Sequence, residues 1–194
     1  MKIVRFSALF FTALALAPAL AHLFELPNKI DLSREEYLIV QQIYSGWALL
    51  GFVVFGALVS NLMLTILLRK NSRAFVLSLI AFLCILGTQA LFWTFTFPAN
   101  QATNNWTFLP DNWQALRYQW EYSHASSAVL NLTAMITLIL AILSEPDRSE
   151  IRNSPTQRTR EHHVDERMAP ACRTPGTQGS RATITSLRTR PYGA

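Results

Sequence analysis

The chain has 194 residues, 51% of them hydrophobic, and a formal net charge of +5. The apolar residues lie in long runs before position 144, whereas residues 145–194 are polar. Runs of that length exceed what a small soluble core needs and match the thickness of a bilayer. The composition therefore excludes an ordinary soluble domain and predicts a membrane protein with a polar C-terminal segment.

The basic residues indicate how the chain is oriented in the membrane. Of the 17 Lys and Arg residues, fourteen lie at the N-terminus (Lys2 and Arg5), in segment 69–73, or after Ser144. Cytoplasmic segments of membrane proteins carry such an excess of positive charge. We therefore expect both termini and segment 69–73 to be cytoplasmic. Because the charge follows this membrane pattern, we do not expect nucleic acid as a partner.

A first span is predicted over about residues 6–24, directly after two basic residues. Ala19-Leu20-Ala21 also resembles a signal-peptidase site, so cleavage after residue 21 is an alternative. The apolar run continues through Leu23 and Phe24 and reaches spanning length, which favours a retained helix. Cleavage would leave three spans and place the C-terminal segment outside.

A second helix is predicted to begin near Arg34, because Ser33 and Glu36 have the spacing of a capping box. With no breaker recognised before Arg69, we expect one continuous helix whose part 46–68 crosses the membrane. Its first turns present a polar face with Tyr37, Gln41 and Tyr44.

A third span is predicted over about 74–97, ending in an aromatic belt that Pro98 should stop. Residues 98–112 are rich in Pro, Asn and Thr and predict an interfacial loop. A fourth helix should run from about Trp113 to Leu143, with 125–143 at lipid depth. The predicted fold is all-α, a four-helix transmembrane bundle over residues 1–146.

Residues 147–194 have no apolar periodicity and are rich in Arg, Ser, Thr, Pro and Gly. This composition predicts a disordered, basic cytoplasmic tail. His162 and His163 could bind a metal there, although a flexible tail supplies no fixed geometry and a solvated patch is the simpler interpretation.

Polar residues at the start of the fourth helix form a stripe on one face, with Arg117, Glu121 and His124 spaced by four and three. Polar groups near membrane depth mark a functional site unless they form structural ion pairs, here Arg117 with Glu121. His22 and Glu25 end the first helix on the same side. We therefore expect two His–carboxylate pairs to face each other, with a His as base and Arg117 holding an anionic oxygen.

A metal site is an alternative use of the same residues, because Glu-x-x-His is a ligand pattern of helical bundles. A di-iron site would need further inward carboxylates, and that side offers few acids (Asp31, Glu35, Glu36 and Asp111). A mononuclear His/His/carboxylate site is the remaining form. We expect no cofactor and keep a metal as the lesser alternative.

Several segments together have the pattern of a known family. They are His22 and Glu25, Tyr44-Ser45-Gly46-Trp47, Pro98-Ala99-Asn100, Trp113-Gln114-Ala115-Leu116-Arg117, and Trp120-Glu121-Tyr122-Ser123-His124. Over residues 1–143 the chain resembles the anthrone oxygenase-like family of small four-helix membrane proteins. The Pro-x-Asn and Trp-x-x-x-Arg-x-x-Trp patterns are the most specific. At the start of the last helix, His124 and Ser127 stand where the family pattern has Asn and Arg.

The resemblance implies oxidation of an anthrone to an anthraquinone by molecular oxygen without an added cofactor. It makes His124 and Asn100 the first positions to test, beside His22, Glu25, Arg117 and Glu121. We expect an oxidoreductase acting on a hydrophobic aromatic or quinone-like molecule that enters from the lipid bilayer. The alternative is a non-catalytic membrane module or accessory subunit whose polar residues are structural.

Overall fold

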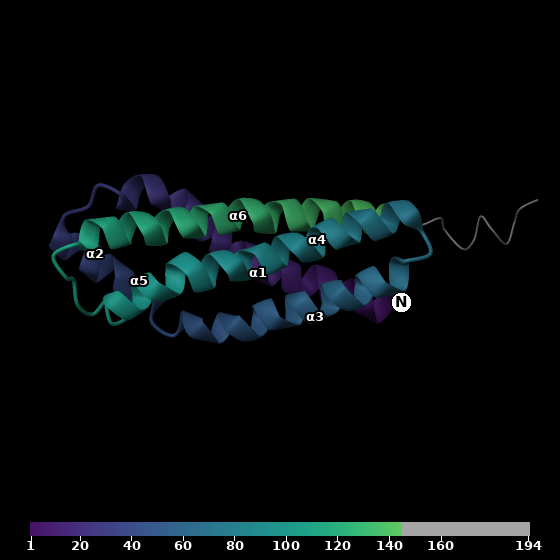
Figure 1. The fold of residues 1–194 in the computed structure, drawn as a ribbon, viewed down its shortest axis with the longest axis horizontal. Coiled ribbons are helices and arrows are strands. Elements are labelled where there is room, and N and C mark those ends of the chain that lie inside the picture. The colour runs from purple at the N-terminus through teal and green to yellow at the C-terminus, as the bar shows by residue number, and fades with distance from the viewer. Residues whose placement is uncertain (145–194) are drawn as a thin grey trace, which may run out of the picture. The chain divides into compact units, whose positions relative to one another are not determined.

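The computed structural model describes residues 1–144, and this part of the chain is built from helices without strands (Figure 1). Four long helices run along the molecule: α1 (Lys2–Lys29), α3 (Gly51–Leu68), α4 (Ser72–Leu91) and α6 (Trp113–Leu143). The predicted tail, residues 147–194, and the histidines at 162 and 163 lie outside the described residues.

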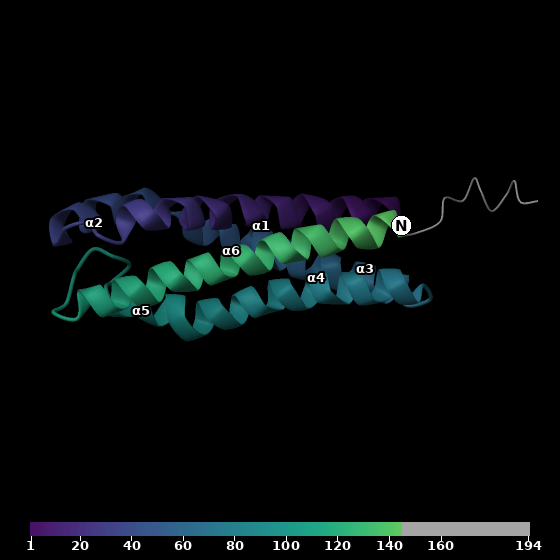
Figure 2. The same cartoon turned by 90° about the horizontal axis from the view of Figure 1, so that it is seen from above.

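The long helices form a four-helix bundle in which α1 and α4 each pack against both α3 and α6 (Figures 1 and 2). Much of the buried core along the bundle is alanine, including Ala57, Ala81 and Ala134. Small side chains let membrane helices approach closely. The outward face is apolar, as Phe52 and Phe55 show by their exposure.

Four helical stretches are long and apolar enough to cross a membrane: Lys2–Lys29, Trp47–Leu68, Ser72–Ala102 and Trp113–Leu143. The predicted all-α fold with four transmembrane helices is therefore confirmed. Two of these stretches are longer than predicted. Helix α1 includes Lys2 and continues through Pro18 and Pro27 to Lys29. The third stretch extends to Ala102. As a result Glu25 and Lys29 both lie on helix α1.

The second helix begins as predicted but does not run unbroken into the membrane. Helix α2 (Arg34–Gln41) starts with a capping box between Ser33 and Glu36. Two 3₁₀ turns follow, η1 (Gln42–Tyr44) and η2 (Trp47–Leu50), and α3 starts only at Gly51. Between them Gly46 has a φ of 85°, a left-handed conformation that glycine adopts readily. The prediction of one continuous helix to Leu68 is wrong for this reason.

The sequence predicted that the third helix would stop at Pro98, but the helix continues past this residue. After α4, residues Phe92–Thr96 form a π-helical turn (η3), and α5 (Phe97–Ala102) continues the helix. Pro98 lies in the first turn of α5, where a missing N–H costs least. Three residues with positive φ, Asn104, Asn105 and Trp106, then turn the chain. Helix α6 has the predicted bounds, Trp113–Leu143.

Candidate functional site

The candidate site lies at one end of the bundle, which we call the mouth. It comprises the last turns of α1, helix α2 with η1 and η2, helix α5, the turn after it, and the first turns of α6. The N-terminus and the turn between α3 and α4 lie at the opposite end (Figure 1). A second buried cluster fills the mouth, and it is richer in aromatic residues than the alanine core below it.

Two stacked imidazoles lie at the centre of the mouth. The rings of His22 on α1 and His124 on α6 have centroids 4.1 Å apart and planes inclined by 29°. The ring of Trp120 lies 4.2 Å from His124 and 5.1 Å from His22, so it contacts both. The two histidines predicted to face each other therefore do so directly, imidazole against imidazole.

The imidazole of His22 is buried, with 5% of its surface exposed. Its Nδ1 atom has no hydrogen-bond partner among residues 1–144. Tyr44 and Trp47 cover the same ring, with centroids 4.6 and 5.5 Å from it. Both residues come from the interrupted stretch between α2 and α3. The sequence predicted Tyr44 on a polar face, whereas the contact of Trp47 with His22 follows a backbone break at Gly46 that was not predicted.

Lys29 forms the central ion pair of the mouth. Its Nζ atom lies 2.9 Å from Oε1 of Glu121 and donates a hydrogen bond of 2.9 Å to the Tyr44 hydroxyl. The side chains of Lys29 and Glu121 are only 4% and 0% exposed. The Lys29 ammonium also lies 4.5 and 4.8 Å from the ring centroids of Tyr44 and Trp120. Cation–π attraction and the buried carboxylate together hold the charge.

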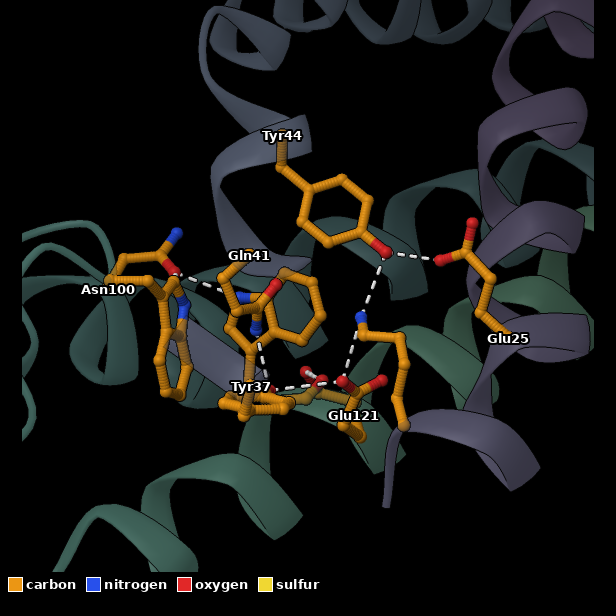
Figure 3. Close-up of polar contacts among 10 residues, drawn as sticks. Glu25, Tyr37, Gln41, Tyr44, Asn100 and Glu121 are labelled. Carbon is orange, nitrogen blue, oxygen red and sulfur yellow. Dashed lines mark hydrogen bonds and ion pairs between the residues drawn. The ribbon is translucent and has the colours of Figure 1, made fainter. Parts of the chain in front are cut away.

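Tyrosine hydroxyls extend this ion pair into a chain of hydrogen bonds that links α1, α2 and α6 (Figure 3). Tyr37 donates to Glu121 Oε1 at 3.0 Å and accepts from the amide of Gln41. Tyr44 accepts from Lys29 and donates to Glu25. These carboxylates therefore bond to tyrosines and Lys29, whereas the sequence predicted that they would pair with the histidines.

Both tyrosines remain protonated donors. Burial, followed by the charge and hydrogen bond of Glu121, raises the pKa of Tyr37 far above its usual value. Burial and the hydrogen bond to Glu25 likewise raise the pKa of Tyr44. An acceptor carboxylate favours the neutral phenol, because a phenolate beside it would add a second negative charge.

Arg117 and Asn100 hold the walls of the mouth together. Arg117 Nη1 donates to the carbonyl of Leu32 at 2.7 Å, and its guanidinium stacks 4.7 Å from the ring centroid of Trp113. The predicted pair of Arg117 with Glu121 does not form, because Lys29 takes that carboxylate. Asn100 Oδ1 accepts from the indole N–H groups of Trp106 at 3.1 Å and Trp120 at 2.9 Å.

The predicted residues thus divide into two groups. His22, His124, Glu25 and Glu121 belong to one cluster of contacting side chains, whereas Arg117 and Asn100 bind backbone and indoles around it. The other members of this cluster are Lys29, Tyr37, Gln41, Tyr44 and Trp120. Within the described part of the chain, no group of three or more His, Cys, Asp or Glu residues is arranged to hold a metal ion.

The arrangement combines a buried ion pair, stacked imidazoles and aromatic walls, which suits proton transfer to and from a flat apolar molecule.

No protein-family model, curated protein or solved structure matches the chain. The interpretation of the site therefore depends on its own geometry.

Proposed function

We propose that this multi-pass membrane protein is an oxidoreductase that acts on a hydrophobic aromatic or quinone-like molecule, which enters the mouth from the bilayer. The observation that carries the proposal is the stacked pair of His22 and His124, 4.1 Å apart and enclosed by aromatic rings. A buried imidazole with an unpartnered nitrogen, as Nδ1 of His22 is among the described residues, is costly without a use.

The chemistry follows from a neutral imidazole, which has one nitrogen able to accept a proton. His22 or His124 would remove a proton from a C–H group activated by flanking aromatic rings. The carbanion would give its electrons to molecular oxygen. For an anthrone, the substrate class implied by the family resemblance, the methylene carbon loses two hydrogens and becomes a carbonyl. One oxygen atom of O₂ enters the product and the other leaves as water.

The proposal includes an orientation for the protein. Lys2 and Arg5 lie in the first turns of α1, and Arg69, Lys70 and Arg73 lie around the turn between α3 and α4. Both regions are at the end of the bundle opposite the mouth (Figure 1). An excess of basic residues is characteristic of cytoplasmic segments. The mouth would therefore open on the non-cytoplasmic side of the cell membrane, with the N- and C-termini in the cytoplasm.

The test uses the full chain in lipid nanodiscs with anthrone under air. Oxygen uptake and anthraquinone absorbance are recorded for the wild type, His22→Asn and His124→Asn. General-base catalysis contributes roughly 100-fold or more, so each substitution should lower the rate by that order. Tyr118→Phe is the matched control, since Tyr118 is an exposed residue of the same helix. Wild-type rates in both His variants, or no turnover by the wild type, would refute the proposal.

A second candidate function is a non-catalytic membrane module, for which the observation is how many polar groups of the mouth already bind one another. Lys29 pairs with Glu121, Asn100 holds two indoles, and Arg117 holds a backbone carbonyl. On this alternative the His variants would unfold at lower temperature but no aromatic substrate would be consumed. The nanodisc assay combined with thermal unfolding separates the two functions.

A further inference from the structure

We infer that Lys29 is a substrate-binding residue of the mouth, and that its ammonium holds the oxygen of an ionising hydroxyl or enol group on the aromatic substrate. The inference rests on the proposed function and assigns to Lys29 the part that the sequence suggested for Arg117. Four features of the mouth support it: the position of Lys29, its free donor, the different surroundings of Arg117, and the acceptors around the ion pair.

Lys29 and the histidines contact the same aromatic rings. The Lys29 Nζ atom lies 4.8 Å from the ring centroid of Trp120, which both imidazoles also contact. The same Nζ atom lies 4.5 Å from the ring centroid of Tyr44, and the His22 ring lies 4.6 Å from that centroid. A flat molecule resting beside the imidazoles would therefore bring an oxygen substituent near this ammonium.

The ammonium retains a donor for that oxygen. A lysine side chain has three N–H donors. The hydrogen bonds described within residues 1–144 use two of them, to the Tyr44 hydroxyl and to Glu121 Oε1. Because Lys29 is only 3% exposed, a charge beside it is little screened by water. A developing negative oxygen would be stabilised more here than at the surface.

Arg117 has unused donors as well, but it lies among other rings than those that cover the imidazoles. Its guanidinium donates to the Leu32 carbonyl and stacks against Trp113. Its nearest tyrosine ring among the described contacts is that of Tyr37, at 5.4 Å, and not Tyr44, which covers His22. Lys29 is therefore the cation that shares its surroundings with the imidazoles.

Acceptor atoms beside the ion pair define the complementary group. Glu121 Oε2 and Gln41 Oε1 are buried and have no hydrogen-bond partner among the described residues. The single hydrogen of Tyr37 goes to Glu121, so Gln41 must donate its amide to Tyr37 and leave its oxygen free. Free acceptors next to a free donor fit a hydroxyl group, which both donates and accepts. A quinone oxygen, which only accepts, fits less well.

The test uses alizarin, a planar dihydroxyanthraquinone whose colour changes when its hydroxyl ionises. The dye is titrated against pH in phosphatidylcholine nanodiscs with and without the full-length protein. The wild type should lower the pH midpoint of the bound dye by about one unit or more, a tenfold change in its ionisation constant. Glu121→Gln should lower the midpoint further, because the ammonium then lacks its carboxylate.

The decisive variant is Lys29→Met combined with Glu121→Gln, which removes both charges and leaves no unpaired ion at the mouth. It should bind the dye with the midpoint of empty nanodiscs, while Tyr118→Phe, at an exposed residue of α6, retains the wild-type shift. A shift that survives in the double variant, or a wild type that does not bind the dye, overturns the inference.

The outcomes also separate the inference from the proposed function. A midpoint shift that depends on Lys29, together with unchanged anthrone turnover in His22→Asn and His124→Asn, would refute the enzyme and keep the binding site. Loss of turnover in the His variants, with a midpoint shift that ignores Lys29, would refute the role of Lys29 alone.

Discussion

The interior of the bundle and the mouth are both buried, but they are held together by different forces. In the interior, α1, α3, α4 and α6 pack through small apolar residues such as Ala57, Ala81 and Ala134. A hydrogen bond between side chains, from Asn61 to Thr12 at 2.9 Å, links α1 to α3 there. At the mouth, charged and aromatic residues from separate segments bind one another.

Close packing therefore stabilises the membrane-spanning part, whereas pairing of polar groups stabilises the mouth. Membrane helices gain little from burying apolar groups, since lipid is equally apolar, so shape decides their association. A buried charge, in contrast, is stable only with its partner. Substitutions in the two regions should therefore fail for different reasons, and four experiments test this difference.

The largest effect is expected from removing one member of the ion pair. Lys29→Ala leaves Glu121 buried without its counter-ion, and breaking such a pair costs about 3–5 kcal/mol. The double variant Lys29→Met with Glu121→Gln should recover most of this loss, because no charge remains unpaired. Thermal unfolding in detergent measures both. Equal losses in the single and double variants would show that packing, not charge, holds the mouth.

The next largest effect concerns Asn100, whose one oxygen accepts from two buried indoles. Asn100→Leu leaves both N–H groups without their acceptor, at about 1–3 kcal/mol for each buried group. Asn100→Asp retains an acceptor oxygen and should lose less. Near-ultraviolet circular dichroism and tryptophan fluorescence report the change. A spectrum identical to the wild type in Asn100→Leu would contradict the assigned role.

A smaller effect is expected in the interior, at Gly56 on α3. A Cβ atom there would lie 2.8 Å from the ring of Phe11 on α1, so the ring must shift. Overpacking of this kind costs about 1–3 kcal/mol, and Gly56→Ala should lower the unfolding temperature. Gly51→Ala is the matched control, because nothing lies within 4 Å of its Cβ position. Equal stability of the two variants would argue against close packing of α1 on α3.

The smallest effect concerns the start of α2. Ser33 donates to Glu36 through its backbone N–H and its hydroxyl, which holds the pKa of Glu36 below its usual value. A lowered pKa in the folded state means that this contribution is present above the unfolded pKa and is lost as the pH falls through the folded one. The protection of the α2 amides, corrected for the intrinsic pH dependence of exchange, should therefore fall below about pH 4.

Two variants control this experiment. Glu36→Gln should remove the loss of α2 protection at low pH, since it has no carboxylate to titrate. Ser33→Ala should raise the exchange at all pH values by removing the cap, a loss of about 1 kcal/mol. Protection of α2 that does not change with pH in the wild type would show that the capping box does not anchor this helix.

Local sequence patterns predicted the regular parts of the fold. The bounds of α6 and the capping box of α2 follow from hydrophobic runs and short-range spacing, which depend on neighbouring residues alone. The irregular backbone at Gly46 and before Pro98 did not follow from these local patterns. Gly46 inside an apolar region was not recognised as a breaker, and Pro98 was taken as a stop although the π-helical turn before it lets the helix continue.

The candidate site was predictable in part. His22, Glu25, Glu121 and His124 were found from their spacing on helix faces, and the structure brings them together. Lys29 lies beyond the first span as predicted, which ended near residue 24, whereas α1 extends to it. Its spacing of seven from His22 could have placed it on the same face. Its pairing with Glu121 could not be predicted, because periodicity within one helix carries no information about which partner another helix supplies.

The shared acceptor of Asn100 gives the mouth a mechanical property. Trp120 forms a wall of the imidazole pair, and its indole bonds to the same oxygen as that of Trp106 in the turn after α5. Pushing Trp120 aside would strain the link that fastens this turn. A molecule that displaces Trp120 would therefore also disturb the turn that Trp106 anchors.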